Sequence, residues 1–178
     1  MNMTHYMELL ATNQPWNLLL FMGVPVVLAE TLAITELYLL YNRNFTGRVR
    51  QVNRLAGITV GIYFIGIILY LIPNAVIPIT QNGEWRTALD VFAVGTYLLS
   101  GIPLILVALQ DLGLIQKKLS ETRKLGWHIT YVAAFLVLGH LAMIAGMADP
   151  SILGYQGPGG HDMEYMDMGT MPSHNMAH

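Results

Sequence analysis

The sequence contains no cysteine and carries little charge. Without cysteine, no disulfide, zinc ribbon, thiolate-ligated iron–sulfur cluster or cysteine nucleophile can form. Charged residues make up 11% of the 178 residues, whereas an ordinary soluble domain has roughly 25%. The basic stretches lack interleaved aromatic residues and the net charge is -2, so nucleic acid is not an expected partner. No nucleophile–base pair has a recognisable spacing, and an enzymatic function is therefore not favoured.

Hydrophobic residues, by contrast, make up 54% of the chain. They are concentrated in four stretches, each close to the roughly 20 residues that a membrane-spanning helix needs. The stretches are separated by short polar loops, which suit antiparallel neighbours. We therefore predict an all-α integral membrane protein, with an up-and-down four-helix bundle over residues 1–148 and spans at about 16–41, 55–79, 88–114 and 127–148.

The basic residues predict the orientation of this bundle. Eight of the nine Lys and Arg residues lie in the first and third loops, and cytoplasmic loops of membrane proteins retain such an excess. We therefore expect a multi-pass protein of a bacterial inner membrane, with both termini in the periplasm. The eight residues are Arg43, Arg48, Arg50, Arg54, Lys117, Lys118, Arg123 and Lys124.

Several ionisable side chains fall within the predicted spans. Insertion of such a group at membrane depth costs roughly 2.5–3.5 kcal/mol, so each needs a partner, a change of protonation or a function. Glu30 and His140 have similar predicted depths, and we expect their side chains to meet if the first and fourth helices are adjacent. Glu30 and Glu36 are candidate proton or charge relays. Asp111 and His128 lie close to the cytoplasmic ends of their spans, where surface roles are expected.

A stripe of soft-metal donors follows the fourth span. His140, Met143 and Met147 stand at positions i, i+3 and i+7, so they share one face of a helix. Thioether and imidazole groups are ligands that Cu(I) accepts, whereas hard cations require carboxylate and carbonyl oxygens. The competing interpretation is that these methionines fill gaps in the packing.

A second set of donors follows a Pro/Gly-rich linker, residues 149–160. Residues 161–178 lack an apolar period, so we expect a disordered tail that a metal ion can order. The Met163–Met166 and Met168–Met171 pairs are MxxM patterns, and Met166–Met168 is MxM. The tail thereby resembles Met/His-rich segments of bacterial periplasmic copper-resistance proteins and chaperones, which implies copper binding. Its candidate ligands are His161, Met163, Met166, Met168, Met171, His174, Met176 and His178.

These patterns predict an inner-membrane protein that binds Cu(I) for homeostasis, delivery or transport. Its expected partners are the lipid bilayer, the copper ion and either a periplasmic copper chaperone or a larger membrane complex, and a homo-oligomer is compatible with the sequence.

Two alternatives remain open. The bundle looks broadly like small four-helix cytochromes b, which implies a haem or quinone-linked redox protein with haem b bound by His140. His128 and His140 are about 18 Å apart on one helix, so they cannot ligate the same haem. The other alternative is an accessory subunit of a larger membrane complex.

Overall fold

The computed structural model describes residues 4, 7–8, 11–43, 47–85 and 87–149. Within these ranges the chain is helical and has no strand. The first long helix comprises α2 (Trp16–Leu18), the π-helical turn η1 (Leu19–Gly23) and α3 (Val24–Asn42). The second comprises α4 (Arg48–Leu71), the π-helical turn η2 (Ile72–Val76) and α5 (Ile77–Asn82). The third is α6 (Ala88–Asp111) and the fourth is α7 (Glu121–Met147).

These four helices are each long and apolar enough to cross a membrane, which confirms the prediction of four such helices. Their bounds differ most for the second, which was expected to begin near residue 55 but begins at Arg48. The basic residues had been assigned to the loop because polar residues usually mark the end of a span. Instead, Arg50 and Asn53 belong to the first two turns of α4, and the Asn53 side chain is fully buried.

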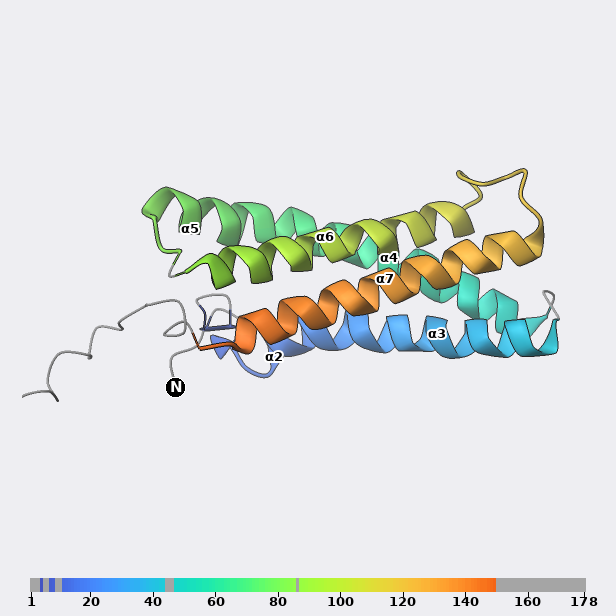
Figure 1. The fold of residues 1–178 in the computed structure, drawn as a ribbon, viewed down its shortest axis with the longest axis horizontal. Coiled ribbons are helices and arrows are strands. Elements are labelled where there is room, and N and C mark those ends of the chain that lie inside the picture. Colours follow the sequence, from blue (N-terminus) through green and yellow to red (C-terminus); the bar gives the residue numbers. More distant parts are fainter. Residues whose placement is uncertain (1–3, 5–6, 9–10, 44–46, 86, 150–178) are drawn as a thin grey trace, which may run out of the picture.

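Successive long helices run in opposite directions and form a ring in the order α3, α4, α6 and α7 (Figure 1). Each packs against its two neighbours, so α3 also contacts α7. The core along the axis is apolar and includes Leu32, Val60, Leu104 and Val132. The outer surface is also rich in large apolar side chains, as expected of helices that face lipid.

Glycines in α4 allow α6 to approach it closely. A Cβ at Gly61 would lie 2.3 Å from the Cβ of Ala108 and 2.8 Å from the backbone oxygen of Leu104. A Cβ at Gly57 would lie 2.1 Å from Oδ2 of Asp111. This small-residue seam is the kind that brings membrane helices together, and at Gly57 it leaves room for a carboxylate between two helices.

Two backbone oxygens of η1 bond to side chains of other helices. Pro25 has no backbone N–H to donate to the Phe21 carbonyl, and the Val24 N–H bonds to Leu19 in the π-helical turn instead of to Leu20. The Tyr97 hydroxyl donates to the Phe21 carbonyl, and the Tyr63 hydroxyl donates to the Leu20 carbonyl at 2.9 Å. Side chains from α6 and α4 thus bond to backbone oxygens in the widened turn η1, as membrane helices require.

Candidate functional sites

A buried cluster of ionisable groups lies at the end of the bundle where α3 and α6 finish and α7 begins. The His128 ring sits between two carboxylates: Nδ1 contacts Oε1 of Glu36, and Nε2 lies 2.8 Å from Oδ2 of Asp111. The relative exposures of His128, Glu36 and Asp111 are 0%, 2% and 5%. Three helices therefore place their ionisable side chains in contact at a position shielded from the surroundings.

Helix α4 adds polar groups to this cluster. Nη2 of Arg50 lies 3.8 Å from Oδ1 of Asp111, and its Nη1 donates to Oδ1 of Asn53 at 3.0 Å. Nδ2 of Asn53 in turn donates to Oγ1 of Thr35 at 2.8 Å, which returns the network to α3. All four long helices are thus linked at this end by ion pairs and hydrogen bonds.

The cluster corrects two expectations from the sequence. Asp111 and His128 were expected at the surface because each lies close to a helix end, yet both side chains point toward the bundle axis and are buried. Glu36, a predicted relay residue, belongs to the cluster, whereas Glu30 is exposed. The similar depths of Glu36, Asp111 and His128 at one end of three spans were the signal that sequence reasoning missed.

The predicted contact between Glu30 and His140 is not formed among the described residues. Because Glu36 meets His128, the two helices have a fixed axial register. Glu30 lies about 9 Å from Glu36 along its helix, whereas His140 lies about 18 Å from His128, at 1.5 Å per residue. The two side chains are therefore at different depths, and the carboxylate–imidazole contact falls to Glu36 and His128 instead.

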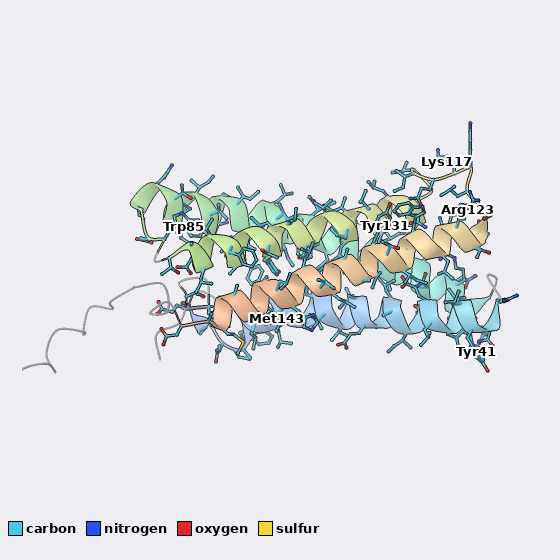
Figure 2. All side chains as sticks on the ribbon, viewed as in Figure 1. Tyr41, Trp85, Lys117, Arg123, Tyr131 and Met143 are labelled. Atoms are coloured by element: carbon cyan, nitrogen blue, oxygen red, sulfur yellow. The ribbon has the colours of Figure 1, made fainter. Side chains whose placement is uncertain are left out.

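A second candidate site lies toward the opposite end of α7, near η1. Figure 2 shows Met143 in this part of α7, whereas Lys117, Arg123 and Tyr41 lie at the other end of the bundle. A small pocket, with a cavity volume of about 30 Å³, is lined by His140 and Met143 of α7 and by Met22 of η1. Apolar side chains complete it, among them Phe21 and Phe135. Met22 is a soft donor that the sequence analysis did not include.

The imidazole of His140 has one nitrogen, Nε2, without a hydrogen-bond partner among the described residues. Nδ1 lies 2.6 Å from the backbone oxygen of Leu136. A carbonyl oxygen can only accept, so Nδ1 carries the hydrogen, and in the neutral imidazole Nε2 carries the lone pair. Such a hydrogen bond fixes the tautomer and leaves Nε2 available as a ligand. Met147, the third member of the predicted stripe, is 68% exposed and is not part of the pocket lining.

The two histidines therefore differ in what they can bind. Both ring nitrogens of His128 face carboxylates, so neither is available to a metal ion or a haem. Across the described ranges, no group of three or more His, Asp or Glu side chains is arranged to hold a metal. The tail ligands predicted from His161 to His178 lie outside the described residues.

Comparison with known proteins places the chain in a family without assigning an activity. The chain belongs to DUF6803, described as a family of unknown function, whose model matches residues 1–162. The match includes both candidate sites and ends just before Met163. No curated protein and no solved structure matches the chain.

Proposed function

We propose that this protein binds Cu(I) at the extracytoplasmic end of its bundle and exchanges it with the Met/His-rich tail. The observation that carries the proposal is the presence of Met22, His140 and Met143 in the lining of one pocket. Two thioethers and one imidazole suit the low coordination number and soft character of Cu(I).

The orientation in this proposal comes from the positive-inside rule. The end of the bundle opposite the pocket carries eight of the nine Lys and Arg residues, in two loops and in the adjoining turns of α4 and α7, and the end of a membrane protein with such an excess stays in the cytoplasm. The pocket then lies toward the periplasmic face of a bacterial inner membrane, as does the end of α7 at Met147. The tail follows α7 after a short linker, so both sets of donors belong to the same side.

Exchange between the tail and the pocket is the proposed mechanism. The tail supplies eight Met and His donors within residues 161–178. Because it is joined to α7, the tail offers these donors to the pocket at a high effective concentration, and transfer becomes intramolecular. The free Nε2 of His140 is the proposed nitrogen ligand, and each thioether binds as a neutral sulfur donor. The ion therefore enters without displacing a proton from these three side chains.

The test is anaerobic Cu(I) binding to purified protein in detergent, measured by competition with a chromophoric chelator. We expect Met22→Leu, Met143→Leu and His140→Leu each to remove one class of bound Cu(I), because each removes a pocket donor. Met147→Leu is the matched control and should retain that class, since its side chain is outside the pocket lining.

Removal of residues 161–178 separates the two sets of donors. The shortened protein should lose most of its Cu(I) while the pocket class persists. Equal Cu(I) binding by the wild type and by a shortened protein carrying all three Leu substitutions would refute the proposal. A Soret band in the absorption spectrum of the purified protein, lost in His140→Leu, would favour the haem alternative instead.

A further inference from the structure

The contacts of His128 determine how many protons the buried cluster contains. A neutral imidazole has one N–H, so between two ionised carboxylates one nitrogen lone pair would face an oxygen lone pair. Both ring nitrogens contact carboxylate oxygens, at Glu36 and at Asp111. Both contacts can be hydrogen bonds only if the cluster holds one proton more than a neutral imidazole between two ionised carboxylates. We infer that Glu36, His128 and Asp111 form a proton-binding site that retains this additional proton.

Charge balance supports retention of the proton. With the proton present, the group formed by Glu36, His128, Asp111 and Arg50 has no net charge, whether the proton lies on the imidazole or on a carboxyl group. Arg50 is the cation whose guanidinium reaches Oδ1 of Asp111, at 3.8 Å. Loss of the proton would leave one uncompensated negative charge among side chains that are almost completely buried, which is strongly unfavourable.

The other charged groups near the cluster do not replace this proton. Arg54 of α4 donates from Nε to the backbone oxygen of Asp111 at 2.9 Å, and its side chain is exposed. On α7, Lys124 and Glu121 pair with each other at 2.8 Å. Because these groups bond to a backbone oxygen or to each other, the charge balance within the cluster depends on His128 and Arg50.

The site is closed toward the pocket end of the bundle. One or two turns from the cluster, each helix contributes an apolar side chain to the axis: Leu32, Val60, Val107 and Val132, all at most 1% exposed. Toward the basic end, Arg50 is partly exposed, with 23% of its side chain accessible. The proton therefore exchanges with water only at the basic end, where α4 and α7 begin. In this exchange an O–H or N–H bond breaks in the cluster as an O–H bond forms on water.

Nuclear magnetic resonance of protein with ¹⁵N-labelled histidine tests the proton count. The His128 signals are assigned by their loss in His128→Gln, and an infrared spectrum reports protonated carboxyl groups. In the wild type we expect either two N–H groups on His128 or one N–H group with one protonated carboxyl. A nitrogen lone pair on His128 without a protonated carboxyl would overturn the inference. The wild-type spectrum alone decides this point.

Neutral variants test the role of the carboxylates. In Glu36→Gln or Asp111→Asn the cluster loses a negative charge, so we expect His128 to become neutral without any protonated carboxyl. Glu30→Gln is the matched control on the same helix and should leave the His128 signals unchanged. Retention of a doubly protonated ring in both cluster variants would contradict the charge-balance argument.

Liposomes test whether the site is closed on one side. Under a pH gradient, liposomes containing metal-free protein should leak protons no faster than empty liposomes, because the apolar layer blocks passage. A faster leak that Glu36→Gln abolishes would refute the one-sided arrangement. These measurements use no copper, so their outcome is independent of the proposed copper site.

Discussion

The hydrogen bond from Tyr97 to the Phe21 carbonyl allows a quantitative test of how the bundle accommodates Pro25. Tyr97→Phe removes the hydroxyl but keeps the ring, which packs against Phe64 with centroids 5.4 Å apart. Tyr97 is 6% exposed, so water cannot easily replace the lost donor. Hydrogen bonds between membrane helices average about 0.6 kcal/mol, whereas an unsatisfied buried acceptor costs about 1–3 kcal/mol. We expect the free energy of unfolding to fall by about 1 kcal/mol, above the average hydrogen bond and at the lower limit of the penalty for an unsatisfied acceptor.

The role of the proline is isolated by a double-mutant cycle. Pro25→Ala restores a backbone N–H that can reach the Phe21 carbonyl, so Tyr97→Phe should cost less than half as much when combined with Pro25→Ala. Stability is measured by reversible unfolding in mixed micelles, followed by far-ultraviolet circular dichroism. Tyr70→Phe is the control, because the Tyr70 hydroxyl bonds to no described residue and its ring is 56% exposed. Equal losses with and without Pro25→Ala would show that Tyr97 does not compensate for the proline.

Three further predictions concern the seam, the polar cluster and the tail. Gly61→Ala should destabilise the bundle by about 1–3 kcal/mol, the usual cost of overpacking. Gly66→Ala is the control and should leave stability unchanged, because a Cβ there would meet open space. The free energies of unfolding of the two variants are compared in mixed micelles. Asn53→Ala should cost about 1–3 kcal/mol, because it removes a buried amide that accepts from Arg50 and donates to Thr35. An unchanged unfolding midpoint would contradict this. Removal of residues 161–178 should lower the Cu(I) stoichiometry without changing the unfolding midpoint, and elemental analysis with circular dichroism checks both.

Much of the fold could be predicted because it depends on properties that are local in the chain. A stretch of about 20 apolar residues needs no tertiary contact to be long enough to cross a membrane. The four helices therefore lie close to where the sequence places them. Helix α4 begins at Arg48, seven residues before the predicted span, because a helix can continue through polar residues when one side of it turns toward a buried polar partner, as at Asn53.

The candidate sites could be predicted only in part, because they depend on the rotation and axial register of neighbouring helices. Position within an apolar span identified Glu36 as a candidate residue, and helical spacing identified His140 and Met143. It could not show that Met22 lines the same pocket as His140, since the two are far apart in the sequence and come together only because η1 and α7 border one pocket.

The sequence by itself determined that the chain is helical and apolar enough for a membrane, because hydropathy and helix length follow from consecutive residues. Only the tertiary structure decided which polar groups meet. A shift of one helical turn between α3 and α7 would separate Glu36 from His128, and a Cβ at Gly57 would occupy the space of the Asp111 carboxylate. These contacts depend on distances of a few ångströms between helices, which no pattern along a single helix specifies.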